Sequence, residues 1–266
     1  MMNVSGSTYA EIEPFFECTY RGKIATKNTG EIDMYYVHRI KPGLSEDEDG
    51  IYPNEKFKKY VDLHLFSSIN YKKAERHIMK VLKDKLPDNL YYHGIHHTYD
   101  VVEAIERIAL LEGITGEEMF VLKSAATYHD AGFVAQYAKN EPIGITMAQE
   151  ILPLYGYTPE QVDEVEKLIY ATIIPHDPKS HLQEIICDAD LDYLGRDDFH
   201  QIADTLRMEL HERGNVGNKR SWDELQIKFL SMHKYFTKSA IRMRQAKKDK
   251  HIEEIKQRLL GKYDDE

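Results

Sequence analysis

Apolar residues recur at helical spacing through most of the chain that follows residue 56. A clear stripe at positions i, i+1, i+4, i+7 and i+8 consists of Val101, Val102, Ile105, Ile108 and Ala109. This spacing places the five side chains on one face of a helix, where they can pack against a core. From the repetition of such stripes we expect about seven to nine helices between Phe57 and Leu260.

Helix-start signals accompany this pattern. A Ser or Thr followed three residues later by Glu or Gln matches the capping box, in which side chains satisfy two amide groups at the helix start. The chain has this arrangement at Thr115, Thr158, Ser180 and Ser221. Pro159, directly after Thr158, also suits the first position of a helix. Each of these places therefore predicts the beginning of a helix.

The first 40 residues follow a different pattern. The segments Phe15–Thr26 and Glu31–Ile40 are rich in β-branched and aromatic residues, and Lys27-Asn28-Thr29-Gly30 between them is a turn signal. Together they predict a β-hairpin. Because an isolated hairpin is only marginally stable in water, we expect it to pack on the helices or on another subunit, as in a homodimer.

The fold class expected from these patterns is all-α, with a short N-terminal β-hairpin extension. Residues 1–40 hold the hairpin. The segment 41–55 begins with an acidic stretch bounded by Pro and Gly, which is typical of a linker. Residues 56–266 are expected to form one helical domain.

Composition narrows the classes of partner. The chain has 266 residues, 42% of them hydrophobic, and a formal charge of −10 from 45 acidic and 35 basic residues. This charge argues against binding to duplex nucleic acid, which requires a basic surface. No apolar run approaches the roughly 20 residues that span a bilayer, and no signal peptide is recognisable, so we expect no membrane partner. The two cysteines, Cys18 and Cys187, are too few for a disulfide framework, and the cytoplasm is the expected location.

Candidate chemistry lies in three short motifs of His and Asp. They are His93-x-x-x-His97, His129-Asp130 and Asp188-Ala189-Asp190, and each lies in sequence that predicts helix. Two His four residues apart share one helical face and can point at one cavity. Imidazole nitrogens and carboxylate oxygens are ligands that hydrolases use for a catalytic divalent ion. The three motifs together therefore indicate a metal site.

The order His, His-Asp, Asp resembles the HD superfamily of metal-dependent phosphohydrolases, from about Phe57 to residue 240. The matching strings are Tyr92-His93-Gly94-Ile95-His96-His97, Ala126-Thr127-Tyr128-His129-Asp130-Ala131-Gly132 and Ile186-Cys187-Asp188-Ala189-Asp190-Leu191. The resemblance implies an HD-domain helical bundle that binds a divalent metal ion, namely Mn, Mg, Fe or Zn.

The resemblance also implies roles for individual residues. His97, His129, Asp130 and Asp190 correspond to the metal ligands, and Asp130 is expected to be catalytic as well. Asp188 competes with Asp190 for the last position. The resemblance favours Asp190, which follows an Ala and precedes a Leu as in many members.

His93 resembles the proton donor of the cyclic-nucleotide phosphodiesterase branch of the same superfamily. An imidazole titrates near neutral pH, so it can donate a proton to a leaving alkoxide. This branch usually has Asn at the next position, where the chain has Gly94. The alternative interpretation is a His in the first helical turn that hydrogen-bonds the backbone.

Three further residues have open roles. Glu141 follows a position where members often have a His, here Asn140, so the resemblance implies one firmly bound ion rather than two. His176 matches a place where relatives have a His that lines the site. His181 follows a predicted helix cap and is expected to be structural.

The function implied by the resemblance is hydrolysis of a phosphoester of a small molecule, by preference a nucleotide, through a metal-activated water. The alternative is a non-catalytic HD-fold module that binds a nucleotide for sensing or regulation. The identity of the substrate does not follow from the sequence, because one fold supports many activities.

Residues 15–38 carry a second resemblance, to the last hairpin of a class III nucleotide cyclase domain. It is based on Phe16–Lys27 and Gly30–Val37. The core strands of a cyclase and their metal-binding acids are absent from the sequence, so we expect no cyclase activity. The hairpin is interpreted as the remnant of a cyclase fusion, or the chain as a fragment of a longer product.

Overall fold

The computed structural model describes residues 2–26, 30–66 and 69–261 of the chain. Residues 27–29 of the predicted turn lie outside the described residues. Two compact units are present, one made of Met1–Ser67 with Gly113–Glu117 and the other of Ser68–Glu112 with Glu118–Glu266. Each unit is described by itself.

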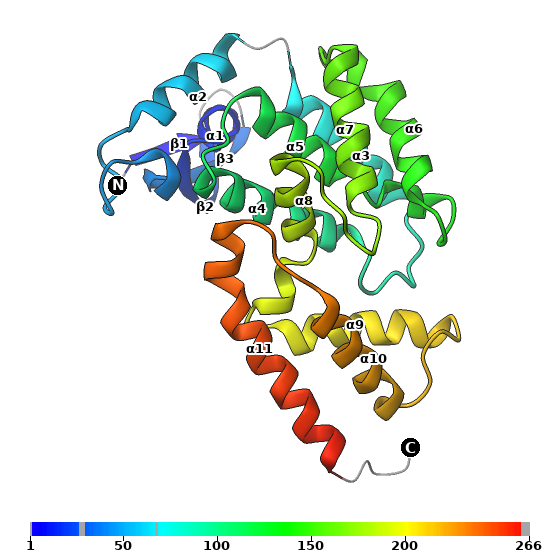
Figure 1. Ribbon diagram of the computed structural model, residues 1–266. Coiled ribbons are helices and arrows are strands. Elements are labelled where there is room, and N and C mark those ends of the chain that lie inside the picture. The colour runs from blue at the N-terminus through cyan, green and yellow to red at the C-terminus, as the bar shows by residue number, and fades with distance from the viewer. Residues whose placement is uncertain (1, 27–29, 67–68, 262–266) are drawn as a thin grey trace. The chain divides into compact units, whose positions relative to one another are not determined.

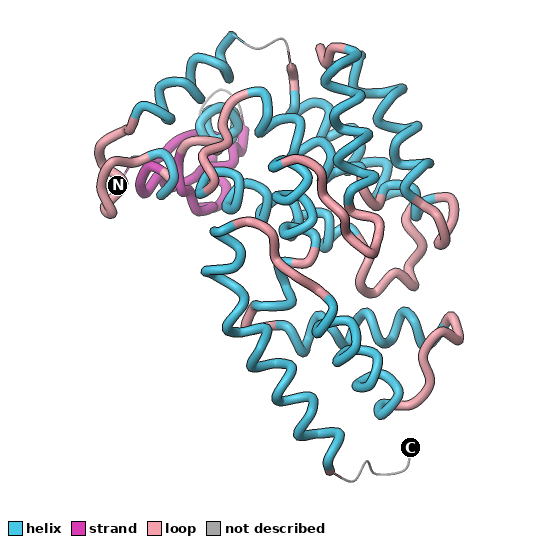
Figure 2. The backbone as a smooth tube through the Cα atoms, in the orientation of Figure 1, coloured by secondary structure: helices cyan, strands magenta, loops and turns pink. Residues whose placement is uncertain are grey.

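The first unit contains the predicted hairpin and one strand that the sequence pattern did not indicate. Strands β2 (Phe16–Thr26) and β3 (Gly30–Ile40) pair in antiparallel fashion. Strand β1 (Met2–Ser5) pairs with the other side of β3, which gives a three-stranded sheet of order β1-β3-β2. Figure 2 shows this sheet in magenta. The added strand gives the hairpin a pairing partner within its own unit.

Aromatic side chains stabilise this sheet. Tyr9 of α1 (Gly6–Ile12) stacks on Tyr35 of β3, with ring centroids 3.8 Å apart. Phe15 is buried and packs on Tyr60 of α2 (Glu55–Phe66), at a centroid distance of 5.2 Å. Helix α2 thus belongs to the unit of the sheet, and the division at residues 40 and 55 stays a prediction.

The segment predicted as a linker is a folded loop. It starts with a 3₁₀ turn at Pro42–Leu44, and the Leu44 side chain is fully buried. The Asp47 carboxylate accepts hydrogen bonds from the backbone N–H groups of Ile51 and Tyr52. Local hydrogen bonds of this kind favour a compact loop over an extended spacer.

The second unit is entirely helical, and it confirms the predicted all-α class with an N-terminal hairpin. Its helices are α3 (Tyr71–Lys85), α4 (Ile95–Leu111), α5 (Glu117–Tyr128), α6 (Glu141–Ile151), α7 (Pro159–Ala171), α8 (His181–Asp190), α9 (Phe199–Glu212), α10 (Lys219–Met232) and α11 (Lys238–Leu260). With α2, the described residues between 55 and 260 hold ten α-helices, one more than the upper end of the expected range. Figure 1 shows their succession along the chain. Among the described helices, none combines the length and the apolar composition that a bilayer crossing requires.

Helix α5 lies in the core of this unit. Every residue from Met119 to Tyr128 is buried. A helix that is buried on all sides has no need of a polar face. Around it, the predicted stripe on α4 is buried at Val101, Ile105 and Ile108, and α8 adds Ile185 to the core. The core therefore fixes the ends of α4, α5 and α8, which carry the candidate ligands.

Of the four predicted helix caps, two agree with the structure and two differ. Helix α5 begins at Glu117, so Thr115 lies one residue before the cap position. Thr158 forms the complete capping box with Gln161 at the start of α7. Ser180 caps α8 by accepting a hydrogen bond from the Gln183 N–H. The predicted cap at Ser221 is wrong, because α10 begins three residues earlier, where the Asn218 side chain accepts from the Ser221 N–H.

Candidate metal centre

The four residues expected to bind a metal lie where three helix ends meet. His97 belongs to the first turn of α4, His129 and Asp130 follow the end of α5, and Asp190 is the last residue of α8. The C-terminal end of a helix carries partial negative charge, which favours a cation. Two such ends, of α5 and α8, meet at this point.

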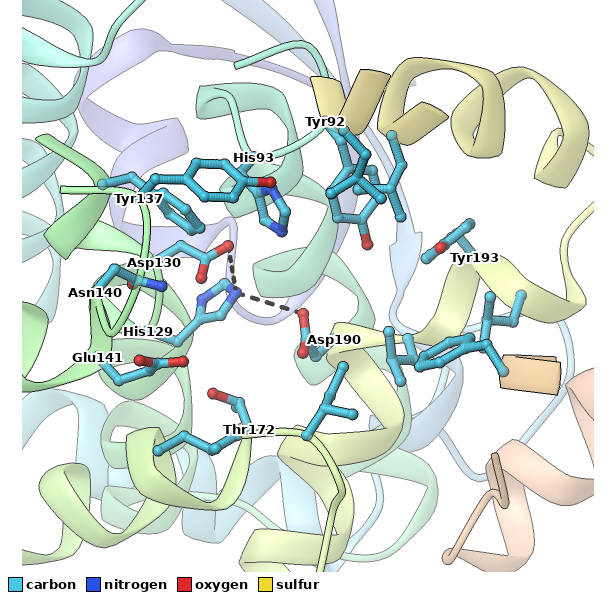
Figure 3. Close-up of a pocket in the computed structure, with 18 of the residues that line it drawn as sticks. Tyr92, His93, His129, Asp130, Tyr137, Asn140, Glu141, Thr172, Asp190 and Tyr193 are labelled. Carbon is cyan, nitrogen blue, oxygen red and sulfur yellow. Dashed lines mark ion pairs between the residues drawn. The ribbon is translucent and has the colours of Figure 1, made fainter. Parts of the chain in front are cut away.

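The ligand atoms of these residues lie close together. His97 Nε2 is 3.3 Å from His129 Nε2 and 3.1 Å from Asp190 Oδ1. Asp130 Oδ2 is 3.2 Å from His129 Nε2 and 3.5 Å from His97 Nε2. His97, His129 and Asp190 have ligand atoms that all lie within 4.8 Å of one another. Figure 3 shows Asp130 and Asp190 on either side of His129.

These separations fit one divalent ion. With metal–ligand bonds of about 2.1 Å, neighbouring ligand atoms are about 3.0 Å apart around a six-coordinate ion and about 3.4 Å around a four-coordinate one. The measured distances between nitrogen and oxygen atoms, 3.1 to 3.5 Å, span these values. The set of two imidazoles and two carboxylates also matches what Zn, Fe or Mn ions accept, whereas Mg is usually held by oxygen.

The orientation of His129 suits a ligand. Its Nδ1 donates a hydrogen bond to the carbonyl oxygen of Ala126, at 2.8 Å, so its Nε2 is the nitrogen that faces the cluster. Burial lowers the pKa of His129, but the neighbouring Asp130 and Asp190 carboxylates outweigh burial and raise it well above its usual value. Burial raises the pKa of Asp190, but hydrogen bonds from His129 and His97 hold it well below its usual range. The cluster therefore favours positive charge at its centre.

The backbone of the His-Asp pair differs from the helix expected from the sequence. Helix α5 ends at Tyr128, and a 3₁₀ turn follows at Ala131–Val134. On a continuous helix, adjacent side chains diverge by about 100°. Because Asp130 has non-helical dihedral angles, φ −105° and ψ 6°, its carboxylate lies beside the imidazole of His129.

Two glycines permit this turn to pack closely. A Cβ atom on Gly132 would lie 1.9 Å from the carbonyl oxygen of Asn140, and one on Gly144 would lie 2.3 Å from that of Tyr128. Contacts this short are not possible for any other residue. The start of α6 therefore lies directly against the segment that carries His129 and Asp130.

Asp188, the competitor of Asp190, has a different environment. Its carboxylate accepts hydrogen bonds from the N–H groups of Phe236 and Thr237 and from the Thr237 hydroxyl, at 2.7 to 2.9 Å. The side chain is fully buried beneath the start of α11. Asp188 thus holds the loop before α11, whereas Asp190 lies in the cluster.

Ion pairs hold the chain immediately after Asp190 in place. Asp192 is buried and accepts hydrogen bonds from Arg107 of α4 and Arg244 of α11, at 2.6 to 2.9 Å. Hydrogen bonds to charged groups are stronger than neutral ones. The position of the last candidate ligand is therefore fixed from both sides.

His93 lies outside α4, which corrects its predicted place in a helix. The helix begins at Ile95, and Gly94 has extended dihedral angles as the N-cap. The cause is Glu209 of α9, whose Oε2 accepts hydrogen bonds from the N–H groups of Tyr92 and His93. The His93 ring nevertheless lies 6.0 Å from the His97 ring, between centroids.

Glu209 also orients the His93 side chain. Its Oε1 accepts hydrogen bonds from His93 Nδ1, at 2.5 Å, and from the Tyr137 hydroxyl, at 2.9 Å. Burial raises the pKa of Glu209, but the hydrogen bond and charge of His93 and the two amide donors lower it to about 2. The carboxylate is therefore ionised at neutral pH, and His93 Nε2 stays available to a ligand (Figure 3).

Glu209 belongs to none of the sequence motifs, although the chain contains one signal for it. Glu209 lies seven residues after Ile202 and three after Leu206, on the apolar stripe of α9. An acidic residue on a buried stripe requires a partner, because an isolated buried charge is unfavourable. The partner itself, 116 residues away in sequence, cannot be read from this pattern.

Of the three residues whose roles the sequence leaves open, one lies at the cluster and two do not. Glu141 lines the cavity at the cluster and begins α6. His176 Nε2 instead bonds the carbonyl oxygen of Thr172, and His181 pairs with Glu184 and Glu112. Neither histidine lines the cavity.

The cluster opens into a cavity with a volume of about 460 Å³. His93, His129, Asp130 and Asp190 line one part of it, whereas His97 lies behind them and is buried. Residues of α9 and α10 line the rest. A volume of this size is typical of sites for small molecules.

A second group of possible ligands is present among the described residues, namely His200, His251 and Glu254. Glu254 Oε2 is 2.9 Å from His200 Nε2 and 3.3 Å from His251 Nδ1. The group joins α9 to α11 and does not line the cavity.

The fold and the cluster define a class of protein, a helical domain that gathers His and Asp side chains at helix ends in an arrangement able to hold a divalent ion. Comparison with protein families identifies the segment that does so, because residues 94–192 match the model of the HD domain. The chain contains an HD domain. At the level of the superfamily, this domain and the cluster support a metal-dependent hydrolase.

Two solved structures, both of one protein, share the fold with TM-scores above 0.5. YpgQ of Bacillus subtilis is 19% identical, with a TM-score of 0.52 over 71% of this chain and 95% of its own. A second structure of YpgQ, in complex with ADP, is 18% identical, with a TM-score of 0.52 over 70% and 94%. A protein described as a predicted HD superfamily hydrolase, from an uncultured Thermotogales bacterium, is 22% identical, with a TM-score of 0.48 over 70% and 91%. No curated protein matches the chain.

Removal of metal from the loaded protein is expected to lower its melting temperature by several degrees. An ion that binds only the native state at 100 times its Kd stabilises that state by about 2.7 kcal/mol. The ligands come from three helices, so the ion would join them. Thermal unfolding with and without EDTA measures the effect, and Asp190→Ala should show no response to EDTA. An equal melting temperature for loaded and stripped wild-type protein would contradict the prediction.

Proposed function

We propose that this chain is a metal-dependent phosphohydrolase that cleaves a phosphoester of a nucleotide. The observation that carries the proposal is the placement of His93. Its ring lines the same cavity as His129, Asp130 and Asp190 and is oriented by a buried carboxylate. A metal site alone suits binding, whereas a metal site beside an oriented proton donor suits hydrolysis.

The proposed metal ligands are His97, His129, Asp130 and Asp190. A divalent ion supplies Lewis-acid polarisation of a phosphoryl group and eases the deprotonation of water. The carboxylate of Asp130 is half-buried beside both imidazoles, where it would bind the ion and accept a hydrogen bond from the attacking water. Asp190 and the two imidazoles complete the set.

His93 is proposed as the general acid. Glu209 accepts the Nδ1 proton of His93, so a protonated ring presents its Nε2 proton to the cavity. Donation of that proton to the leaving oxygen prevents the build-up of negative charge on it. Phe133 stacks on the ring, with centroids 4.6 Å apart, and limits its rotation. Tyr137 binds the same oxygen of Glu209 and keeps the carboxylate in place.

A nucleotide substrate is supported by two observations. The structure of YpgQ in complex with ADP is that of a protein with the same fold. The cavity of this chain, at about 460 Å³, has room for a nucleoside beside the cluster.

A hydrolysis screen tests the proposal. Purified protein stripped with chelator and reloaded with Mn, Mg, Fe or Zn ions is incubated with nucleoside mono-, di- and triphosphates, cyclic nucleotides and a nitrophenyl phosphate. Release of phosphate or nucleoside that requires the metal is expected. Nucleotide binding without turnover for every metal would instead indicate a regulatory binding module and would overturn the enzymatic proposal.

A further inference from the structure

The cavity continues from the metal centre along one face of α10. Its walls there are Leu206 and Leu210 of α9 and Trp222, Leu225, Phe229 and Leu230 of α10. The spacing of the α10 residues, at i, i+3, i+7 and i+8, is that of one helical face. The part of the cavity that is lined by α9 and α10, which follow the HD segment in sequence, is therefore apolar and aromatic. We name this face of α10, with Gln226 included, the α10 wall.

Gln226 is the exception in the α10 wall. It is 7% exposed, and the structure gives its amide no hydrogen-bond partner within the described residues. Since Gln226 lines the cavity, its donor and acceptor are accessible to a ligand placed there. An amide in an apolar wall thus has the properties of a recognition group.

The charges around the cavity limit the number of phosphates. Among the described residues that line it, Lys139 is the single Lys or Arg, whereas Asp130, Glu141 and Asp190 are acidic. The guanidinium of Arg213 is engaged elsewhere, since it lies 4.0 Å from the ring centroid of Tyr137 and donates to the Glu209 carbonyl. Sites for triphosphates commonly use several cationic or backbone donors along the phosphate chain. One phosphoryl group at the metal centre, with Lys139 nearby, is what these charges accommodate.

We propose, on the basis of the proposed function, that the α10 wall binds the base of a nucleoside monophosphate and that Gln226 recognises its edge. The amide presents one donor and one acceptor side by side, which complements the hydrogen-bonding edge of a nucleobase. Trp222 and Phe229 supply aromatic surface for a planar ring, a contact that every base can make. Gln226 is thus a specificity-determining residue outside the HD segment.

The first experiment measures base binding without metal or turnover. Trp222 is the only tryptophan of the chain and lies in the α10 wall, so its fluorescence reports on a ligand bound there. Stripped protein in EDTA is titrated with adenosine, guanosine, cytidine and uridine, and with ribose 5-phosphate as a ligand without a base. A saturable change with at least one nucleoside and none with ribose 5-phosphate is expected. No change with any nucleoside would overturn the inference.

Variants of α10 make the test specific. Gln226→Leu should weaken binding of the preferred nucleoside by about tenfold or more, while its melting temperature stays equal or rises because the wall is apolar. Lys228→Leu, on the exposed face of the same helix, is the matched control and should bind as the wild type does. If Gln226→Leu does not fold, Gln226→Met gives the same comparison. Wild-type affinity in either folded Gln226 variant would overturn the role of Gln226.

The second experiment separates this inference from the proposed function. With metal-loaded protein, kcat/KM for the nucleoside monophosphate should exceed that for the triphosphate by about tenfold or more. A preference for the triphosphate would overturn the limit to one phosphate. Nucleoside binding sensitive to Gln226, together with no hydrolysis of any phosphoester, would support the α10 wall and contradict only the enzymatic proposal.

Discussion

Replacement of Asp190 with Ala is expected to abolish metal retention and to lower turnover by at least about 1,000-fold. The carboxylate lies 3.1 Å from His97 Nε2 and 3.4 Å from His129 Nε2, so its loss removes one side of the proposed coordination sphere. A catalytic ion supplies several kcal/mol of charge stabilisation, and each 1.36 kcal/mol corresponds to a factor of ten in rate. Elemental analysis of the purified protein and steady-state kinetics measure the two effects. Normal metal stoichiometry in this variant would contradict the assignment.

Asp188→Asn is the matched control, because Asp188 lies two residues away on the same helix. It should retain metal but lower the free energy of unfolding by about 1 to 3 kcal/mol, since hydrogen bonds to Phe236 and Thr237 are weakened. Denaturant unfolding measures this loss. The two variants therefore separate a ligand from a structural carboxylate. Loss of metal from folded Asp188→Asn, with metal retained in Asp190→Ala, would reverse the assignment.

Replacement of His93 with Ala is expected to lower kcat by about 100- to 10,000-fold while metal content stays normal. This range is the usual contribution of general acid–base catalysis. The defect should be much smaller on a nitrophenyl ester, whose leaving group needs no proton. Equal losses on both kinds of substrate would place His93 in substrate binding, and loss of the ion would make it a ligand.

The orienting role of Glu209 predicts a weaker version of the same effect. Glu209→Gln keeps the shape of the side chain but removes the charge that fixes His93, so turnover of natural substrates should decrease more than that of nitrophenyl esters. Glu212→Gln, three residues further along α9, is the control, because the Glu212 carboxylate accepts a hydrogen bond from the Tyr91 hydroxyl and does not line the cavity. A melting curve for each variant shows whether the fold is retained.

Much of the helical fold follows from local sequence. The stripe around Ile105 predicts the buried face of α4, and Thr158 and Ser180 mark the starts of α7 and α8 correctly, because caps and stripes depend on residues a few positions apart. Ser221 and Asn218 are both good N-cap residues, so only the side-chain geometry shows that Asn218 caps α10. Strand β1 has no pattern of its own and is stabilised by pairing with β3.

The sequence predicts those residues of the candidate site that lie in short motifs. The four expected ligands are indeed close in space, yet their role as ligands stays a prediction. The non-helical backbone of His93 could not be foreseen, since it depends on Glu209, more than 100 residues away. Gln226 has no motif at all and is notable only because the fold buries it beside a cavity. The resemblance of the hairpin to a cyclase also stays a prediction.

The order of these features along the chain has an evolutionary consequence. All four proposed ligands fall within residues 94–192, whereas His93, Glu209 and the α10 wall lie outside that segment. The proposed metal site and the proposed site for the base therefore lie in separate stretches of sequence. Natural variation in α9 and α10 could change the substrate while the proposed metal ligands stay the same. A gene with this layout can diversify its selectivity by changes in the codons for α9 and α10 alone.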